Sequence, residues 1–340
     1  MFEAAFWLAP LSALFFTVLL CRRFLAADSW FHVLDQPGHR SLHETPVPRT
    51  GGIALITSVA VCWTAAVAVG WLHWIEPWGW VLSGMLALGL LGALDDRFDL
   101  PAVWRLLVQA VIAGGLVYAG FELRVVWLPG LSFPLPDGLA ALISFLFILW
   151  MINLYNFMDG MDGFAGGMGS MGFAVLGYLG WQMEHYDYAL AAWVVAGANL
   201  GFLWFNFPPA KIFMGDAGAP TLGMLVAVFA LWADREELFP LWMSLLIFSV
   251  FVVDASFTLM RRTLRGEKIW QAHREHLYQR LVLSGWSHKK TLLWAYALML
   301  SSGVTAVQVW NRPAMVQWMV LGVWAMLFGV LILRFGFRKI

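Results

Sequence analysis

Long apolar runs separated by short polar segments occupy almost the whole chain of 340 residues. A helix needs about 20 apolar residues to cross the hydrocarbon core of a bilayer. The pattern therefore predicts an all-α polytopic membrane protein with about eleven transmembrane helices. The expected spans are residues 2–21, 51–72, 78–94, 103–120, 138–157, 162–181, 187–207, 217–233, 240–260, 291–310 and 314–333.

The polar segments between these runs are short, except for one at about residues 261–290. We find no linker that would separate a soluble domain, so residues 1–340 are expected to form a single membrane domain. The run at 162–181 is rich in Gly and Met, which predicts a helix that is kinked or tightly packed against its neighbours.

The basic residues indicate how the chain is oriented. Glu3 precedes the first apolar run, whereas Arg22 and Arg23 follow it, which is the reverse of a cleavable signal peptide. With eleven spans and the N-terminus outside, 18 of the 21 Lys and Arg residues fall on the inner side. Because cytoplasmic loops carry the excess of Lys and Arg, we expect a periplasmic N-terminus and a cytoplasmic C-terminus.

Composition excludes two broad classes of protein. The chain is 61% hydrophobic and 12% charged, whereas a soluble domain carries about 25% charged residues. The formal net charge is zero, so the chain lacks the overall basic balance of a nucleic-acid-binding protein. Cys21 and Cys62 both lie in apolar runs, which favours packing roles and no disulfide framework.

Adjacent carboxylates follow the third apolar run, at Asp95 and Asp96, with Asp99 close behind. Charges next to hydrocarbon are costly and usually mark a functional site. Neighbouring residues on a helix point about 100° apart, so Asp95 and Asp96 are expected to have two separate roles. The alternative is an ordinary helix end whose carboxylate caps the next helix.

A second polar cluster ends the fifth run, where Asn or Asp recurs at every third position: Asn153, Asn156, Asp159 and Asp162. On an ideal helix this stripe would drift by about 60° per step, so it faces one cleft only if the helix ends here. Gly160 and Gly163 allow such an end. Oxygen ligands of this kind suit Mg²⁺. The alternative is a polar turn between two helices.

A third cluster, Asn206–Gly218, places the cation Lys211, the ring of Phe213 and the carboxylate of Asp216 in one short loop. Glycines in such a loop let backbone N–H groups approach an anion closely. We expect Asp216 to be able to hold Mg²⁺ and Phe213 to be able to stack on a base. A Pro/Gly turn with a helix cap is the alternative.

Two further segments carry basic side chains. In the long inner loop, His273, His276 and Arg280 are spaced i, i+3, i+7, which predicts one basic helix face able to hold a phosphate. Binding of anionic lipid explains the same charges equally well. The turn-rich segment from Asp35 to the glycines after Arg49 is a second candidate for phosphate contact.

Asp254 stands apart, inside the ninth run, with Arg261 seven residues later. A buried pair, or a polar contact to another helix, is the favoured interpretation. A transporter would place its charged residues near the middle of the bilayer. Here only Asp254 is deep and the other acidic clusters gather at one side, which favours catalysis on a cytoplasmic substrate. A structural scaffold gives no reason for the Asn and Asp runs.

Taken in order, these clusters resemble the polyprenyl-phosphate N-acetylhexosamine-1-phosphate transferase family, to which WecA and MraY belong. The form of residues 273–280, His-Arg-Glu-His-Leu-Tyr-Gln-Arg, is similar to the WbpL-type branch that initiates O-antigen synthesis. The consecutive histidines of MraY are absent. The resemblance implies a cytoplasmic catalytic cleft in the inner membrane of a bacterium. It also implies transfer of a sugar phosphate from a UDP-N-acetylhexosamine to undecaprenyl phosphate, with Mg²⁺ or Mn²⁺ and release of UMP.

The resemblance also implies residue roles. Asp216 matches the principal metal ligand and Asn156 a second one. Asp95, Asp96 and Asp159 match catalytic residues, and Asp159 would also lie near the nucleotide sugar. The matching substrate-binding residues are Asp162, Asn206, Phe213 (on uracil), Lys211, His273, His276, Arg280 and Arg49. A phosphate monoester is already mostly dianionic at neutral pH, so we expect Asp95 to orient the lipid phosphate rather than act as a strong base. A homodimer is compatible with this assignment, and the sugar stays open among N-acetylglucosamine, N-acetylfucosamine and related N-acetylated sugars.

Overall fold

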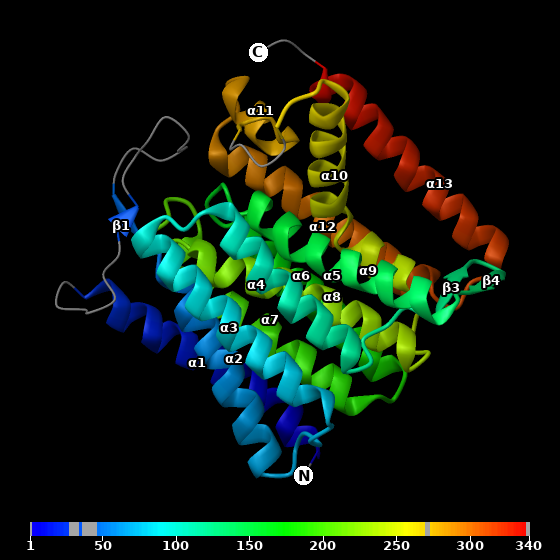
Figure 1. Ribbon diagram of the computed structural model, residues 1–340, viewed down its shortest axis with the longest axis horizontal. Helices are drawn as coiled ribbons and strands as arrows, with labels where there is room; N and C mark the ends of the chain where they lie inside the picture. Colours follow the sequence, from blue (N-terminus) through cyan, green and yellow to red (C-terminus); the bar gives the residue numbers. More distant parts are fainter. Residues whose placement is uncertain (1, 27–33, 36–45, 269–272, 338–340) are drawn as a thin grey trace.

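The computed structural model describes residues 2–26, 34–35, 46–268 and 273–337, and these residues are mainly α-helical (Figure 1). Most of the long helices run roughly along one direction (Figure 1). Their bounds are α1 Phe2–Leu25, α2 Gly51–Ala68, α3 Pro77–Phe98, α4 Ala102–Tyr118, α5 Asp137–Met158, α6 Phe164–Gln182, α7 Tyr186–Asn206, α8 Gly215–Arg235, α9 Leu241–Ile247, α10 Ser249–Leu264, α11 Leu277–Leu283, α12 His288–Val309 and α13 Ala314–Leu331, followed by a short π-helix, η1 Ile332–Gly336.

Eight helices in the described part of the chain are long and apolar enough to cross a membrane: α1, α2, α3, α5, α7, α8, α12 and α13. Helices α9 and α10 together make a ninth candidate, and α4 is a shorter apolar helix. The prediction of an all-α polytopic membrane protein is therefore confirmed. The count of eleven spans and the direction in which they cross stay predictions.

The segment 240–260 differs from the single helix expected there. It is divided into α9 and α10, whose axes differ by 87°. The break falls at Phe248, whose ring is buried at 1% exposure and packs on Phe173 at a centroid distance of 6.0 Å. A Cβ on Gly172 would meet the same ring, so a small residue makes room for it. The buried ring therefore fixes the point where α10 turns out of the direction of α9.

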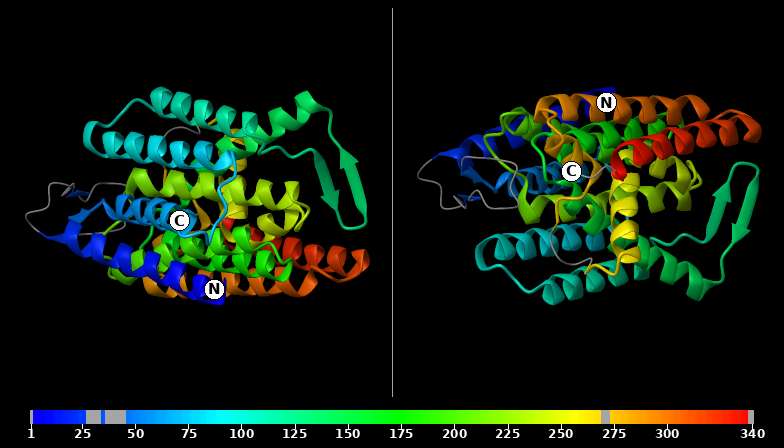
Figure 2. Two further views of the ribbon diagram at one scale, coloured as in Figure 1. Left: turned by 90° about the horizontal axis from the view of Figure 1, so that it is seen from below. Right: turned by 90° about the horizontal axis from the view of Figure 1, so that it is seen from above.

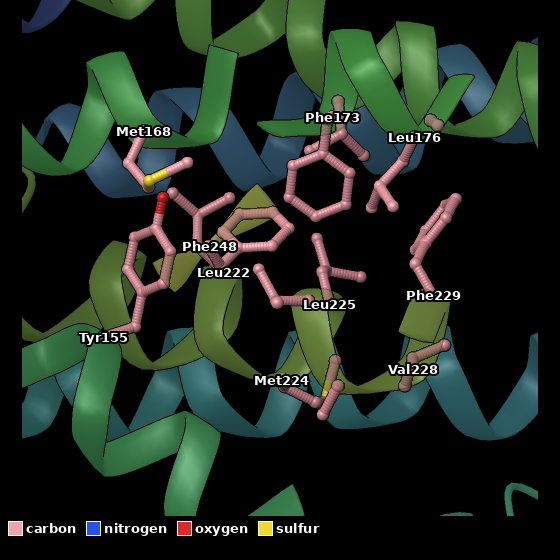
Figure 3. Close-up of a cluster of buried hydrophobic side chains, with 14 of the residues drawn as sticks. Tyr155, Met168, Phe173, Leu176, Leu222, Met224, Leu225, Val228, Phe229 and Phe248 are labelled. Carbon is pink, nitrogen blue, oxygen red and sulfur yellow. The ribbon is translucent and has the colours of Figure 1, made fainter. Parts of the chain in front are cut away.

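Helix α8 forms the centre of the molecule, because 94% of its apolar stretch is buried. Figure 3 shows Leu222, Leu225 and Phe229 of this helix packed between side chains of α5 and α6. A helix that is apolar all round can be buried on every side in this way. The central place of α8 matters because its first turn carries Asp216.

Two short antiparallel hairpins mark opposite ends of the bundle (Figures 1 and 2). At one end β1 (Leu34–Asp35) pairs with β2 (Val47–Pro48). At the other, β3 (Val125–Leu128) pairs with β4 (Leu131–Pro134), and Gly130 takes a positive φ of 74° in the turn. The apolar pattern did not predict these strands. Part of the candidate phosphate segment, residues 36–45, lies outside the described residues.

Candidate active site

Two segments far apart in the sequence form one backbone unit at the start of α8. Phe213 donates its N–H to the carbonyl of Pro48 at 2.7 Å. Gly51 and Gly52 donate in turn to the carbonyls of Phe213 and Met214, each at 2.9 Å. The glycine pair and the Phe213 loop, which the sequence analysis treated as separate candidates, are therefore parts of one structure.

Helices α3 and α8 touch through their backbones at Gly92. A Cβ at this position would lie 2.1 Å from the carbonyl oxygen of Asp216, closer than any real contact. This approach places the end of α3 against the first turn of α8. Asp95 and Asp216 both line one cavity at this junction, so their carboxyl groups lie near each other. Two carboxylates held this near each other repel, and a proton or a cation between them relieves the repulsion.

Two arginine side chains form ion pairs with the carboxylates near the end of α3. Arg49 Nη1 lies 3.2 Å from Asp96 Oδ1, and Arg105 Nη1 lies 2.6 Å from Asp95 Oδ2. The other oxygen of Asp95 accepts a hydrogen bond from the N–H of Leu100 at 2.8 Å. Asp95 and Asp96 therefore have separate partners, as their adjacent positions predicted. Asp95 thus fixes the connection that leads to α4, but it does not cap that helix, whose N-cap is Pro101 without a side-chain hydrogen bond.

Helix α5 ends at Met158, so Asp159 is the first residue beyond it, as a single-cleft arrangement required. Removal from water raises the pKa of the Asp159 carboxyl well above its usual range, and the carboxylates of Asp216, Asp96 and Asp162 raise it further. That influence shows that the three predicted acidic clusters lie within electrostatic reach of one another. Asp162 accepts a hydrogen bond from the N–H of Ala210 at 2.9 Å and so also holds the loop before α8.

A cavity of about 170 Å³ opens between α3, α4, α5 and α8. Asp95, Asn156 and Asp216 all line it, and they come from three different helices. The remaining lining residues are Leu88, Leu91, Gly92, Ala102, Arg105, Leu106, Gln109, Asn153, Phe157 and Pro220. The cavity lining thus combines carboxylate, amide and guanidinium groups with apolar side chains.

Sequence reasoning missed two of the polar lining residues, Arg105 and Gln109. Gln109 is buried and accepts a hydrogen bond from Asn153 Nδ2 at 2.8 Å. The sequence signals for these two residues were the lone amide of Gln109 inside an apolar run and the charge of Arg105 at the start of that run. Both were visible in the sequence, but neither forms a motif.

The other predicted substrate residues take varied positions. The buried amide of Asn206 is used within the protein, since its oxygen accepts from the N–H of Gly163 and its nitrogen donates to Ile212, each at 2.9 Å. Lys211 is exposed and Phe213 is half-buried. These three residues do not line the described cavity, although the loop that carries them leads directly into Asp216.

The basic face predicted for residues 273–280 is wrong. Helix α11 begins only at Leu277, so His273 and His276 precede it and do not share a face with Arg280. Arg280 instead donates to the carbonyl of Phe335 at 3.0 Å. The helix starts late because its first N–H groups donate to the carboxylate of Asp254 from α10.

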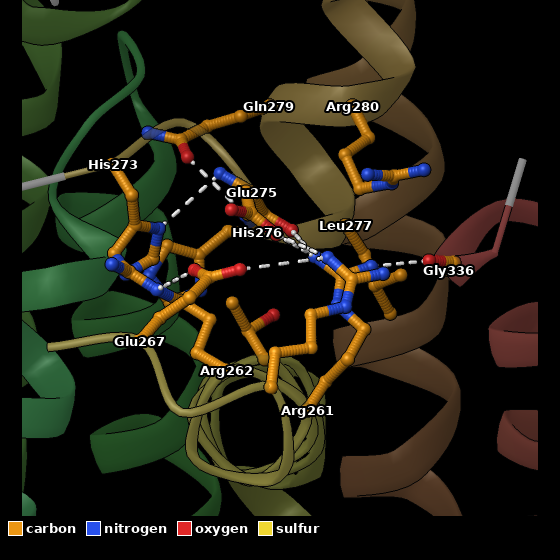
Figure 4. Close-up of polar contacts among 12 residues, drawn as sticks. Arg261, Arg262, Glu267, His273, Glu275, His276, Leu277, Gln279, Arg280 and Gly336 are labelled. Atoms are coloured by element: carbon orange, nitrogen blue, oxygen red, sulfur yellow. Dashed lines mark hydrogen bonds and ion pairs between the residues drawn. The ribbon is translucent and has the colours of Figure 1, made fainter. Parts of the chain in front are cut away.

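His276 is buried at 2% exposure, and its ring stacks near Phe157 of the cavity wall at a centroid distance of 6.3 Å. Its Nδ1 lies 3.3 Å from Asp254 Oδ1. Asp254 therefore makes a polar contact to another element, one of the two interpretations that the sequence allowed. The other, a pair with Arg261, is wrong, because that guanidinium meets Glu275 Oε2 at 2.5 Å (Figure 4).

The donor chemistry of the cavity suits Mg²⁺ in one particular manner. Within the ranges that the structure describes, no three His, Cys, Asp or Glu side chains are arranged to hold a metal ion by themselves. Mg²⁺, however, is usually held by one or two carboxylates together with water and substrate phosphates. Asp216 and Asn156 offer hard oxygen ligands in the same cavity, and they fit a metal that arrives with a phosphate.

Comparison with known proteins places the chain among membrane transferases. A family model described as "Glycosyl transferase family 4" matches residues 78–234. A probable undecaprenyl-phosphate N-acetylglucosaminyl 1-phosphate transferase of Bacillus subtilis is 27% identical over 81% of this chain and 76% of its own length. A decaprenyl-phosphate N-acetylglucosaminephosphotransferase of Mycobacterium tuberculosis is 29% identical over 76% and 71%.

A phospho-N-acetylmuramoyl-pentapeptide-transferase of Bacillus pumilus is 32% identical over 77% of this chain and 84% of its own length. The matched model covers the stretch in which α3, α5 and α8 supply the carboxylates and amide of the cavity. The chain belongs to the WecA/MraY-like family of polyprenyl-phosphate N-acetylhexosamine-1-phosphate transferases.

Proposed function

We propose that this enzyme transfers an N-acetylhexosamine 1-phosphate from a UDP-N-acetyl sugar to undecaprenyl phosphate, giving undecaprenyl-diphospho-sugar and UMP. The observation that carries the proposal is the meeting of Asp95, Asn156 and Asp216 in one cavity, beside Arg105. Both substrates are anionic, so reaction requires their charges to be neutralised and their phosphates to be aligned. Positioning and electrostatics supply most of the catalysis in phosphoryl transfer.

The cation in this proposal is Mg²⁺, held by Asp216 with Asn156 beside it; Mn²⁺ suits the same ligands. When bound, it would neutralise the diphosphate and stabilise the leaving UMP. A divalent cation bound there would also offset the repulsion among the nearby carboxylates of Asp96, Asp159 and Asp216, which raises the pKa of Asp159 in its absence. Arg49 limits this charge through its ion pair with Asp96.

Asp95 is suited to orienting a phosphate rather than to removing a proton. Both of its oxygens are occupied, one by Arg105 and the other by the N–H of Leu100. It therefore holds the guanidinium of Arg105 at the cavity wall, where that group can meet the lipid phosphate. This arrangement needs no base, since the phosphate is already mostly dianionic at neutral pH.

The donor would be bound by the loops around the cavity. We assign the uracil to the ring of Phe213, with Asn206 fixing the loop beneath it, and the diphosphate to Lys211 and His276. His273 precedes α11, Arg280 lies within that helix and Asp162 lies between α5 and α6, and all three stay predicted contacts. The side chain of Arg280, turned toward the carbonyl of Phe335, would have to give up that hydrogen bond to reach a phosphate.

We further propose that the cavity opens to the cytoplasm from the bacterial inner membrane and that the product initiates O-antigen or a related envelope glycan. The 18 basic residues on one side of the eleven expected spans, against three on the other, support this orientation. The His-Arg-Glu-His sequence of the loop supports the O-antigen branch.

The direct test uses the purified enzyme with Mg²⁺, undecaprenyl phosphate and a panel of UDP-sugars, with UMP release as the measurement. We expect release with at least one N-acetylated sugar, none without the lipid phosphate, and none in the presence of a chelator. Absence of release with every N-acetylated sugar in the panel would contradict the proposal.

A further inference from the structure

Asp254 lies in the second turn of α10 and is only 5% exposed, yet none of the roles given above to the family's acidic motifs falls on it. Its Oδ1 accepts from the N–H of Leu277 at 2.7 Å, and its Oδ2 accepts from the N–H of Tyr278 at 3.1 Å. The hydroxyl of Thr258 donates to Oδ1 at 3.2 Å. Two backbone donors at the start of α11 are thus satisfied by one carboxylate from another helix.

The same carboxylate reaches the ring of His276, whose Nδ1 is 3.3 Å from Oδ1. When the carboxylate accepts a hydrogen bond from this nitrogen, Nδ1 carries the proton and Nε2 is the acceptor of the neutral ring. The neighbouring Tyr278 donates its hydroxyl to the carbonyl of Phe157 at 3.4 Å, while a side chain on Gly160 would collide with that hydroxyl. The start of α11 is therefore held from α10 on one side and from the Asn/Asp turn on the other.

The bend between α9 and α10 makes this contact. Continued straight, the ninth apolar run would carry Asp254 into the membrane core, where an unpaired carboxylate is costly. The 87° turn instead directs α10 across the bundle (Figure 1). Asp254 thereby meets residues 276–278. The carboxylate and the bend together connect the membrane helices to the loop beside the cavity.

We propose that Asp254 is a positioning residue: it holds His276 and the first turn of α11 against the cavity wall, and through them it sets the affinity for the nucleotide-sugar donor. This inference rests on the proposed function for its substrate. The lipid phosphate is assigned to Arg105 of α4, which is held by Asp95 and not by Asp254, so its binding is expected to be independent of Asp254. We therefore expect the loss of this carboxylate to raise KM for the UDP-sugar and to leave KM for the lipid phosphate nearly unchanged.

The test compares Asp254→Asn with a matched control, Asp234→Asn. Asp234 is also buried, at 6% exposure, and also accepts the first N–H of a seven-residue helix, from Leu241 of α9 at 3.0 Å. It lies at the far end of α8, about 27 Å from Asp216 at 1.5 Å per residue. The Asn side chain at 254 would present an NH₂ group to donors and lose one of the two bonds. We expect KM for the UDP-sugar to rise about tenfold or more, while KM for the lipid phosphate stays within about twofold and Asp234→Asn changes neither.

Two further measurements separate positioning from general damage. In a His276→Ala background, Asp254→Asn should raise KM for the UDP-sugar by less than about twofold more, because the effects of contacting residues that act together are not additive. Hydrogen exchange of the amides in residues 273–283 should speed up in Asp254→Asn and stay unchanged in Asp234→Asn. This exchange result does not depend on which sugar is the substrate, so it still tests the contact if the proposed reaction fails.

An unchanged donor KM in Asp254→Asn, or unchanged exchange in residues 273–283, would overturn the proposal. The proposal would also be overturned if the increases in donor KM caused by Asp254→Asn and by His276→Ala multiplied in the double variant. If Asp254→Asn does not accumulate in the membrane, Asp254→Glu replaces it, since it keeps the charge but is longer by one methylene. A donor KM equal to that of the unmodified enzyme in Asp254→Glu would then be the contradicting result.

Discussion

Replacement of Gly92 by alanine tests whether the backbone contact between α3 and α8 sets the geometry of the site. The added Cβ would lie 2.1 Å from the carbonyl oxygen of Asp216 and 2.2 Å from the N of Ala217, whereas ordinary contacts begin at 3.4 Å. Both neighbours are backbone atoms of α8, so they cannot rotate away. The two helices must therefore separate by more than 1 Å. Asp95 lies one turn beyond Gly92 and would move away from Asp216 with its helix.

The expected magnitudes follow from that displacement. Overpacking of this kind costs about 1–3 kcal/mol of stability, and a misplacement of about 1 Å at a reacting centre can cost about a hundredfold in rate. We expect Gly92→Ala to insert and fold, with a lower unfolding temperature, and to release UMP at about one hundredth of the normal rate. The assay is UMP release per mole of detergent-purified protein at saturating substrates, with thermal unfolding measured on the same sample.

Gly114→Ala is the matched control. It lies in α4, where a new Cβ meets nothing within 4 Å. Since alanine is favoured over glycine in a helix by about 1 kcal/mol, this variant should be as stable as the unmodified protein or more so, with an unchanged rate. A Gly92→Ala enzyme that turned over within twofold of normal would show that the contact does not fix the carboxylates, and would refute the reasoning.

Three more outcomes are expected. Asp216→Ala should lose at least about 99% of UMP release while still inserting, because phosphate neutralisation depends on it, whereas Asp234→Asn should stay active; an active Asp216→Ala enzyme would remove that residue from the metal site. Asp95→Asn should lower kcat by a uniform factor across pH, since its oxygens hold Arg105 and Leu100; recovery of the rate at high pH would instead indicate a base. Asn206→Leu leaves two buried backbone groups without their amide partner, so unfolding should be easier by about 1–3 kcal/mol, as measured by denaturant titration in detergent; unaltered stability would show that the amide is not a structural clamp.

The sequence predicted the helical membrane class, and it indicated that Asp95 and Asp96 point in different directions and so meet different partners. Both inferences depend on local spacing and on the cost of charge beside hydrocarbon. The sequence also placed the end of α5 correctly, where Asp159 had to leave the helix. It did not place Arg105 in the site, since one arginine at a helix start has no local signature. The backbone approach at Gly92 brings the end of α3 to the first turn of α8, and such a contact joins positions more than 120 residues apart.

The error at residues 273–280 has a more instructive cause. The spacing of His273, His276 and Arg280 suits a helix, but a helix begins where its first N–H groups find partners. Here those partners belong to Asp254 of α10, so α11 starts at Leu277 and His276 is left outside it. Asp254 can reach that point only because the chain bends at Phe248. The orientation of the histidine is thus decided by a buried ring in the membrane core, through a bent helix and one carboxylate. The spacing of residues within the loop carries no information about the ring of Phe248, the bend of the helix or the carboxylate of Asp254.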